Sequence, residues 1–510
     1  MKRLSVIIPA QNEAVSIRQV ITEAKKLHPM EIIVVLNGST DGTREQISGL
    51  DCRILDYPHP LGNDIGRAIG AAYARGDIFL FLDGDIPVSF DQLLAFVEII
   101  ESGYHVALND LQWSAQLPIR PHITTVAKLA HNWITRQMLS VNSLLAIPHA
   151  LSRTAVAAIG WWNLADPVLA QTLLTEKGFI ITAPVSVDVI NHNRIRPVHS
   201  SLAANSPFPV TTDRIIGDHL AALSHLIGTK GPRGGFTDGL RNRKLLQGYR
   251  APNSGRRVRA KRSAVIPVME ERATIGQVIQ AVRLAGVDEI IVVANGADPE
   301  TIRTAVLEGV IVLPFDQPLG HNVGRAIGAA YSTGEICLFV DGDFALQPDQ
   351  LIPFLRAVEQ GVDVALNDLQ CLLDWHHPLD AVSTVKYFLN LALKRPDLLN
   401  NSMTAVPHAI HRRVLDAIGY SSLMIPPLAQ AKAVLAGYRV EAVHEVDVVQ
   451  PNRARPDHQT SSGPHSAYNR ITGDHLEALH YLFQVTDHRG GFTDGRRDRQ
   501  LLQNVRREKA

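Results

Sequence analysis

Apolar runs alternate with helical patterns, in the same order, in both halves of this 510-residue chain. The run Leu4–Pro9 has no helical spacing and predicts a buried strand. In Glu13–Leu27, apolar residues recur every three or four positions, which predicts an amphipathic helix. Further strands are expected over Glu31–Leu36 and Arg53–Tyr57, followed by a helix over Ile65–Tyr73. This alternation is typical of a mostly parallel sheet with right-handed crossovers.

The next apolar run ends in two carboxylates. The sequence GDIFLFLDGD, from Gly76 to Asp85, returns as GEICLFVDGD, from Gly334 to Asp343. Open α/β sheets bind ligands at the carboxyl ends of their strands, and paired carboxylates suit hard cations such as Mn or Mg. A single copy is better explained as an acidic turn, because Asp-Gly is a common turn dipeptide. Two copies after the same kind of strand favour a divalent-metal site.

The whole pattern is duplicated. PLGNDIGRAIGAAY at Pro60 returns as PLGHNVGRAIGAAY at Pro318, and an offset of 258 residues separates Asp83 from Asp341. This period is far longer than those of solenoid repeats, so the chain is a tandem duplication of a domain. We expect a first domain over residues 1–246, a basic linker over 247–262 and a second domain over 263–510.

Composition changes this picture little. The chain is 45% hydrophobic and 20% charged with a net charge of +0, which is ordinary for a globular protein and gives no general reason to expect nucleic acid binding. Its three cysteines form no CxxC motif, which excludes a cysteine zinc cluster and fits a reducing compartment. The first apolar run is too short for a signal peptide, so we expect a cytoplasmic protein. The segment His122–Leu145 predicts either a packing or interface helix, with self-association, or membrane-peripheral contact.

The ordered segments SVIIPAQNE, IIVVLNGSTDGT, a Gly-containing turn with its helix, and FLDGD together resemble the nucleotide-sugar-binding half of GT-A fold glycosyltransferases, closest to family 2. The resemblance is close over the first half of each repeat and looser beyond it. It implies two tandem GT-A, Rossmann-like domains with mostly parallel mixed sheets. It also implies a metal-dependent, hexosyltransferase-type enzyme that moves a sugar from a nucleotide-diphosphate donor to a small-molecule, phosphorylated or lipid-linked acceptor.

The resemblance also implies site residues in both halves. In the first half, the implied donor-binding residues are Pro9, Gln11, Glu13, Asn37, Asp41, Gly62, Arg67 and Asp83, with Asp85 on the metal. In the second half, they are Pro267, Glu271, Asn295, Asp298, Gly320, Arg325 and Asp341, with Asp343 on the metal. Met269 replaces Gln11, a mild departure in the nucleoside pocket. Taken alone, Pro9 and Glu13 are equally well explained as a strand-ending proline and a helix-start carboxylate.

The acceptor side leaves two alternatives open. Family 2 enzymes use a carboxylate that opens a helix as catalytic base, and Asp166 lies at such a position. Asp166 is equally well explained as a helix N-cap before Pro167. In the second half Ile425 takes its place, so either that half has lost turnover or neither half uses this position.

A second resemblance concerns basic stretches near the end of each repeat. NHNRIRP at Asn191 and PNRARPDH at Pro451 are similar to a stretch of the retaining glucosyl-3-phosphoglycerate synthases, which use a His beside the metal. His192, His199 and His458 are therefore candidate metal neighbours, and the arginines of these stretches could clamp a phosphorylated acceptor. Surface residues on a solvated loop are the alternative.

The two halves end alike, in RGGFTDGLRNR at Arg233 and RGGFTDGRRDR at Arg489. These stretches predict either mobile loops over phosphates or arms packed on their own domain or on the other. Two functions of another class also remain: a nucleotidyltransferase, although PAQNE lacks the usual Gly-rich loop with a basic residue, and a nucleotide-sugar-binding protein with a non-catalytic half.

Overall fold

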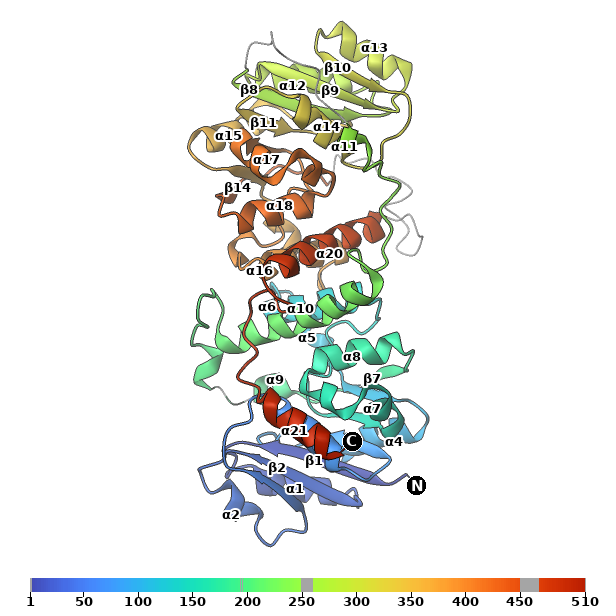
Figure 1. Cartoon of the computed structure of the whole chain (residues 1–510), viewed down its shortest axis with the longest axis vertical. Helices are drawn as coiled ribbons and strands as arrows, with labels where there is room; N and C mark the ends of the chain where they lie inside the picture. The colour runs from blue at the N-terminus through green and yellow to red at the C-terminus, as the bar shows by residue number, and fades with distance from the viewer. Residues whose placement is uncertain (1, 193, 195, 249–259, 450–466, 510) are drawn as a thin grey trace. The chain divides into compact units, whose positions relative to one another are not determined.

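The computed structural model describes residues 2–192, 194, 196–248, 260–449 and 467–509 (Figure 1). Contacts divide the chain into two units: unit 1 comprises Met1–Leu226 with His488–Ala510, and unit 2 comprises Ile227–Asp487. Each unit contains one seven-stranded sheet with helices packed on both faces. The α/β fold class and the mostly parallel mixed sheets expected from the sequence are therefore confirmed.

The sheet of unit 1 has the strand order β3-β2-β1-β4-β6-β5-β7, in which β6 is antiparallel to both of its neighbours. Its strands are β1 (Leu4–Ala10), β2 (Glu31–Asn37), β3 (Arg53–Tyr57), β4 (Ile78–Phe81), β5 (Val106–Asn109), β6 (His149–Ser152) and β7 (Ile181–Val185). Strand β4 is buried at every position because helices cover both faces of the sheet, which explains its continuous apolar sequence.

One face of this sheet is covered by α1 (Ile17–Lys25) and α4 (Phe90–Glu101), and the other by α3 (Ile65–Tyr73), α7 (Arg153–Ile159) and α8 (Pro167–Glu176). Each of these helices turns buried apolar side chains toward the sheet. Further helices are α2 (Thr43–Ile47), α5 (Trp113–Gln116), α6 (Ile123–Ile134), η1 (Trp161–Ala165), α9 (Val189–His192), η2 (Pro197–His199), α10 (Val210–Lys230) and α21 (Arg499–Lys509).

Unit 2 repeats this architecture with the strand order β10-β9-β8-β11-β13-β12-β14. Its strands are β8 (Arg262–Val268), β9 (Glu289–Asn295), β10 (Ile311–Phe315), β11 (Ile336–Phe339), β12 (Val364–Asn367), β13 (His408–His411) and β14 (Val440–His444). Its helices include α11 (Leu245–Gly248), α12 (Ile275–Leu284), α13 (Pro299–Leu307), α14 (Val323–Tyr331), α15 (Pro348–Glu359), η3 (Gln370–Asp374), α16 (Ala381–Ala392), η4 (Pro396–Leu398), α17 (Arg412–Ile418), η5 (Tyr420–Met424), α18 (Pro426–Leu435) and α20 (Ala467–Val485).

The segment that ends each repeat packs in the unit built by the other repeat. We call residues 227–248 the first arm and His488–Ala510 the second arm. The first arm lies in unit 2, where Arg233 Nη1 donates a hydrogen bond to Asp474 Oδ1 at 2.8 Å. The second arm lies in unit 1, where Arg489 Nη1 donates to Asp218 Oδ1 at 2.9 Å. The boundaries drawn from the repeats, 1–246 and 263–510, follow the sequence, whereas the folded units exchange their arms.

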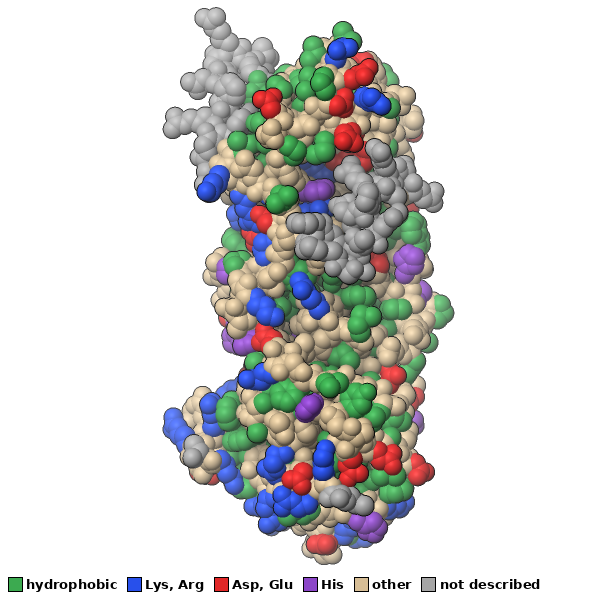
Figure 2. Space-filling view, turned by 90° about the vertical axis from the view of Figure 1, so that its right-hand side faces the viewer, with side chains coloured by type: hydrophobic (Ala, Val, Ile, Leu, Met, Phe, Trp, Pro, Cys, Tyr) green, Lys and Arg blue, Asp and Glu red, His purple; other side chains and the backbone are tan. Residues whose placement is uncertain are grey.

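Of the basic linker expected over 247–262, residues 249–259 lie outside the described residues, and Arg262 already begins β8. On the face drawn in Figure 2, basic and acidic side chains are interspersed, in keeping with the net charge of +0. Within the described residues, no helix has the length and apolar character needed to cross a membrane.

Candidate active site

Three carboxylates gather at one edge of the sheet in unit 1. Strands β1, β2, β3 and β4 are parallel, so their carboxyl ends share this edge. Asp83 and Asp85 closely follow β4, and Glu13 lies in the loop that follows β1. Ser16 Oγ, just before α1, donates a hydrogen bond to Gly84 O at 2.8 Å and fixes the loop between the two aspartates. The structure thus brings together three of the residues proposed from the sequence.

Arg196 lies between two of these carboxylates. Its Nη2 donates hydrogen bonds to Glu13 Oε1 at 2.6 Å and to Asp85 Oδ2 at 3.0 Å. Burial, reinforced by the charge of Asp85, raises the pKa of Glu13 to about 7. The donor set of Glu13, Asp83 and Asp85 consists of carboxylate oxygens, the ligands that divalent Mg or Mn prefers, so its chemistry fits such a cation. In this structure Arg196 balances part of its negative charge.

Arg67, on the first turn of α3, connects this edge to a deeper carboxylate. Its Nη2 donates to Asp83 Oδ1 at 3.3 Å, and its Nη1 lies 3.0 Å from Asp64 Oδ1. Helix α3 packs closely against the sheet because Gly66 has no side chain. A Cβ at Gly66 would stand only 2.9 Å from Pro9 Cβ. Pro9 is therefore a packing contact of α3. Burial opposes the charge on Arg67, but Asp83 and Asp64 outweigh it and raise the Arg67 pKa.

Other residues proposed in the first half shape the loops around this edge. Asn37 Oδ1 accepts a hydrogen bond from Leu61 N, which fixes the turn that contains Gly62. Gly62 has a φ of +80°, and a Cβ there would collide with Arg496 O of the second arm at 2.4 Å. Asp41 Oδ2 accepts from Ala14 N at 3.1 Å and ties the loops after β1 and β2 together. Gln11 is exposed beside them. Whether these residues also contact a donor stays a prediction.

The three candidate histidines have different surroundings. His192 is exposed, and its Nδ1 donates to Asp188 O at 2.6 Å. His199 Nδ1 accepts from Arg196 N at 3.2 Å, so His199 lies beside the arginine that bridges Glu13 and Asp85. His458 lies outside the described residues. Among the three, His199 is the one that a described contact links to the carboxylate edge.

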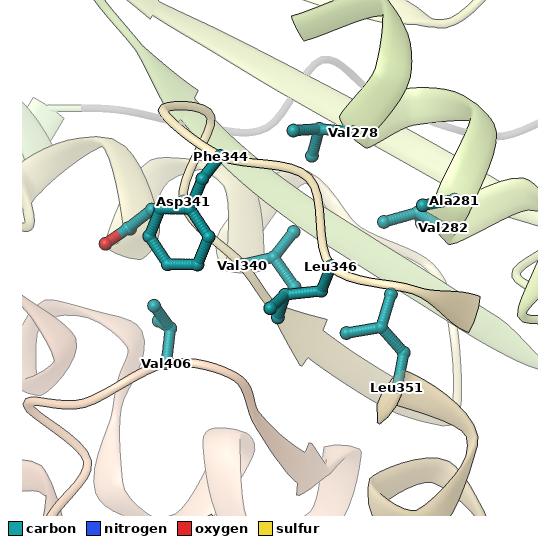
Figure 3. Close-up of a pocket in the computed structure, with 9 residues that line it drawn as sticks. All are labelled: Val278, Ala281, Val282, Val340, Asp341, Phe344, Leu346, Leu351 and Val406. Carbon is teal, nitrogen blue, oxygen red and sulfur yellow. The ribbon is translucent and has the colours of Figure 1, made fainter. Parts of the chain in front are cut away.

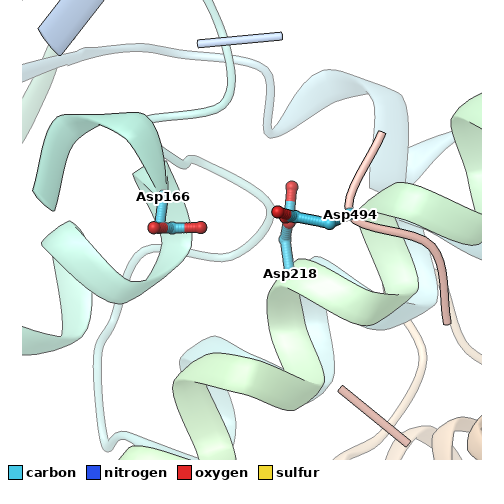
Figure 4. Close-up of side chains that lie close together, drawn as sticks. All are labelled: Asp166, Asp218 and Asp494. Atoms are coloured by element: carbon cyan, nitrogen blue, oxygen red, sulfur yellow. The ribbon is translucent and has the colours of Figure 1, made fainter. Parts of the chain in front are cut away.

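Asp166, the candidate base, does not cap α8 through its side chain. Instead, two nitrogens of Arg499 donate to its two oxygens, Nη2 to Oδ1 at 2.6 Å. Together with Asp218 of α10 and Asp494 of the second arm, Asp166 forms an acidic cluster (Figure 4). The guanidinium of Arg497 lies at its centre, because its Nη1 is 2.7 Å from Asp218, 2.8 Å from Asp494 and 3.7 Å from Asp166. This cluster holds an arginine where a metal ion would otherwise be considered.

The second half keeps part of this arrangement. Arg325 Nη2 donates to Asp341 Oδ1 at 2.7 Å, the counterpart of the Arg67–Asp83 contact. Thr274 Oγ1 donates to Gly342 O at 2.6 Å and holds the Asp341–Asp343 loop as Ser16 does in the first half. Glu271 accepts a hydrogen bond from Met269 N within its own loop.

The remaining positions proposed in the second half have structural contacts. Asn295 Oδ1 accepts from Leu319 N in the turn that contains Gly320. Asp298 caps α13 by accepting from Thr301 N at 3.0 Å. A Cβ at Gly324 would stand 3.2 Å from Pro267 Cβ, which makes Pro267 a helix-packing contact. A Cβ at Gly320 would lie 2.7 Å from the backbone of the first arm.

A narrow hollow lies beside Asp341 (Figure 3). Its lining is otherwise apolar: Val278, Ala281, Val282, Val340, Phe344, Leu346, Leu351 and Val406. The side chain of Asp341 stands at one end, and its carboxylate oxygen points away from the apolar residues in Figure 3. The hollow separates α12 from the loop after β11 and offers a ligand no hydrogen-bonding side chain other than Asp341 among these lining residues.

Sequence comparison matches the first part of each half to a known family. The model of glycosyl transferase family 2 matches residues 5–115 and again residues 263–369. The chain carries two family 2-like, GT-A fold domains. Each match starts within the first strand of its half and extends past the paired aspartates, so the resemblance drawn from the sequence is confirmed in both repeats. Glycosyltransferase AglD of Haloferax volcanii is 30% identical over 149 residues, 27% of this chain and 24% of that protein. The chain thus matches about a quarter of the length of this curated relative.

Solved structures of glucosyl-3-phosphoglycerate synthase from Mycobacterium tuberculosis are also similar. The complex with uridine diphosphate is 20% identical with a TM-score of 0.34, and the match covers 43% of this chain and 80% of that one. The complex with Mn2+, uridine diphosphate and phosphoglyceric acid is 21% identical with a TM-score of 0.34, over 43% and 78%.

The sequence alone does not predict the network behind the edge that carries Asp83 and Asp85. It indicates Arg196 only as an acceptor clamp, and local patterns do not mark Asp64 or Arg214. For Arg497 a signal existed, since the arm motif keeps this arginine in both repeats as Arg241 and Arg497.

Proposed function

We propose that the first half is a glycosyltransferase site, which binds a nucleotide-diphosphate sugar with a divalent cation and transfers the sugar to an acceptor hydroxyl. The observation that carries the proposal is the convergence of Glu13, Asp83 and Asp85 with Arg67 and Arg196 at the ligand-binding edge of a family 2-like domain. A diphosphate needs both a cation and guanidinium donors, and this edge supplies groups for each.

In this proposal Asp85 and Asp83 hold the cation, and Arg67 binds the diphosphate. When bound, the cation would neutralise the charge that develops on the leaving diphosphate. The loops fixed by Asn37 and Asp41 would surround the nucleoside. A nucleotidyltransferase is less well supported, because the family match covers this edge in both halves.

The stereochemistry depends on Asp166. A carboxylate whose two oxygens accept from one guanidinium is poorly placed to take up a proton, because its lone pairs are engaged. This contact supports the alternative that the reaction proceeds without a family 2-type base at residue 166, as in a retaining transferase.

The second half is proposed to bind a donor without turning it over. Arg325 and Asp341 keep their contact, but Met269 replaces Gln11, and Ile425 cannot supply a base if the reaction needs one at the position of Asp166.

The test compares Asp85→Asn with Asp343→Asn, the matched substitution in the other half. Hydrolysis and binding of UDP-, GDP- and ADP-sugars are measured with manganese and with a chelator. We expect Asp85→Asn to abolish manganese-dependent hydrolysis and Asp343→Asn to retain it. Loss in both variants would mean two working sites, and no binding of any sugar nucleotide to the unaltered protein would refute the proposal.

A further inference from the structure

We propose that Arg497, supplied by the second arm, is a positioning residue for the donor site of the first half. It balances the charge of Asp64 and thereby allows Arg67 to remain on Asp83. The inference rests on the proposed function, since it takes Arg67 and Asp83 as donor-binding groups. It makes the first site dependent on the last residues of the second repeat.

A continuous series of charged contacts connects the arm to the donor edge. Arg497 Nη2 donates to Asp64 Oδ2 at 2.9 Å, and its side chain is completely buried. Asp64 lies 3.0 Å from Arg67 Nη1, and Arg67 Nη2 contacts Asp83 at 3.3 Å. Arg214 Nη1 also donates to Asp64 Oδ2, at 3.2 Å. Three guanidinium groups thus share one buried carboxylate, and one of the three also serves the donor edge.

The two carboxylates that contact Arg67 compete for it. Burial would raise the pKa of Asp64, but Arg67, Arg214 and Arg497 outweigh it and keep that carboxyl ionised. Attraction between buried charges is strong because little water screens it. Without Arg497, Asp64 would have fewer cations around it and would draw Arg67 inward, away from Asp83. With Arg497 in place, part of the charge of Asp64 is already balanced.

The second half shows the same arm without this connection. Arg241, the counterpart of Arg497, donates to both oxygens of Asp474 at 2.7 and 2.6 Å. The counterpart of Asp64, however, is the neutral Asn322. There Arg325 contacts Asp341 at 2.7 Å, shorter than the 3.3 Å of Arg67 and Asp83. This difference is the one expected if Asp64 draws Arg67 away from Asp83 and Asn322 does not draw Arg325.

Variants of the full chain test the inference through binding. The probes are UDP, GDP and ADP, each with manganese, titrated into the unaltered protein, Arg497→Lys, Asp64→Asn and the matched control Arg241→Lys. A lysine cannot reproduce the forked contacts of Arg497. We expect Arg497→Lys to weaken nucleotide binding about tenfold, a size typical of coupling within one charge network. Arg241→Lys should leave nucleotide binding at the first site unchanged.

The double variant separates positioning from general damage to the fold. In the Asp64→Asn background, Arg497→Lys should have no further effect on nucleotide affinity. An equal loss in both backgrounds would overturn the inference, because Arg497 would then act without Asp64.

Crystal structures give a second readout that needs no nucleotide. The Arg67–Asp83 separation should lengthen in Arg497→Lys and should shorten toward 2.7 Å, the value of Arg325–Asp341, in Asp64→Asn. Unchanged separations in both variants would refute the inference. If no nucleotide binds the unaltered protein, the proposed function fails, while these separations still decide the role of Arg497. Asp64→Asn alone carries the test if Arg497→Lys does not fold.

Discussion

The arm pockets are the surroundings of Asp218 in unit 1 and of Asp474 in unit 2, where the arms bind. Each provides one carboxylate for the same arginine of the arm, but at a different position. In unit 1, Arg499 of the second arm pairs with Asp166, just before α8. In unit 2, the matching Arg243 pairs with Glu477 on α20, at 2.7 and 2.8 Å. Ile425 replaces Asp166 in the second repeat, and the first repeat has an alanine at the position of Glu477. Each pocket therefore keeps one carboxylate for this arginine, although the carboxylate has moved from a loop to a helix.

The edges that carry the paired aspartates differ in another way, because one charged position becomes neutral. The first half has Asp64, which contacts Arg67, where the second half has Asn322. The retained carboxylates of the arm pockets indicate a shared structural requirement. The exchange of Asp64 for Asn322 is in keeping with the proposal that the two sites differ in function.

Removing the central carboxylate of an arm pocket should have the largest effect on stability. Asp218 is fully buried and accepts from Arg214, Arg489 and Arg497. We expect Asp218→Ala to lower the free energy of unfolding by about 3–5 kcal/mol, because it leaves buried arginines without their partner. Asp474→Ala should cost a similar amount in unit 2. Urea unfolding followed by circular dichroism measures both, and a loss below about 1 kcal/mol would mean that the arm is held mainly by other contacts.

The sequence predicted the sheets well because their signals are local. Apolar runs gave the strands, Asp-Gly-Asp marked the end of β4 and of β11, and the duplicated pattern gave two domains. It did not reveal which domain each arm joins. The stretch around Gly234 and that around Gly490 are nearly identical, so either would fit either pocket. The arm sequences alone therefore do not distinguish between the two pairings.

The environment of Asp166 was unpredictable for a related reason. The local sequence suggested an N-cap or a base, since both depend on the helix that begins at Pro167. Its actual partner, Arg499, is 333 residues away in the sequence. An ion pair over such a distance leaves no local pattern, although the exchange of Asp166 for Ile425 and the appearance of Glu477 are visible once the pockets are compared.

Acid should destabilise both halves alike through a histidine that they share. His149 and His408 are buried against Phe81 and Phe339, and burial, followed by the charge of Arg67 or of its counterpart in the second half, lowers each histidine pKa to about 3. The unfolded chain takes up protons first, so stability is lost as pH falls from the ordinary histidine value near 6.5 toward 3.

The slope of the unfolding free energy against pH measures this effect. Each buried histidine contributes up to about 1.4 kcal/mol per pH unit within that window. His149→Gln and His408→Gln should each reduce the slope by a similar amount. Asp64 lies near His149 and Asp341 near His408, so the Asp64→Asn variant serves as a control for the charge of that neighbour. A reduction in one half alone would show that the two histidines do not have equivalent surroundings.

The smallest expected effect on stability comes from moving the carboxylate that pairs with Arg499 from residue 166 to residue 221, the position of Glu477 in the second half. In the first half, Asp166→Ile removes a partner of Arg499, which keeps Asp494 and is partly exposed. We expect a loss of about 1–2 kcal/mol in the free energy of unfolding, less than for a fully buried pair. Adding Ala221→Glu copies the arrangement of the second half and should restore most of that loss.

The same pair of substitutions decides what Asp166 does in catalysis. Stability and donor turnover are measured on Asp166→Ile and on Asp166→Ile with Ala221→Glu. If Asp166 only anchors the second arm, both quantities recover together in the double variant, because the introduced glutamate would hold Arg499 as Glu477 holds Arg243. If Asp166 is also the base, stability recovers and turnover does not, since a carboxylate displaced to α10 cannot reach the acceptor from the same point. Recovery of neither would show that the two pockets are less alike than their arginine contacts suggest.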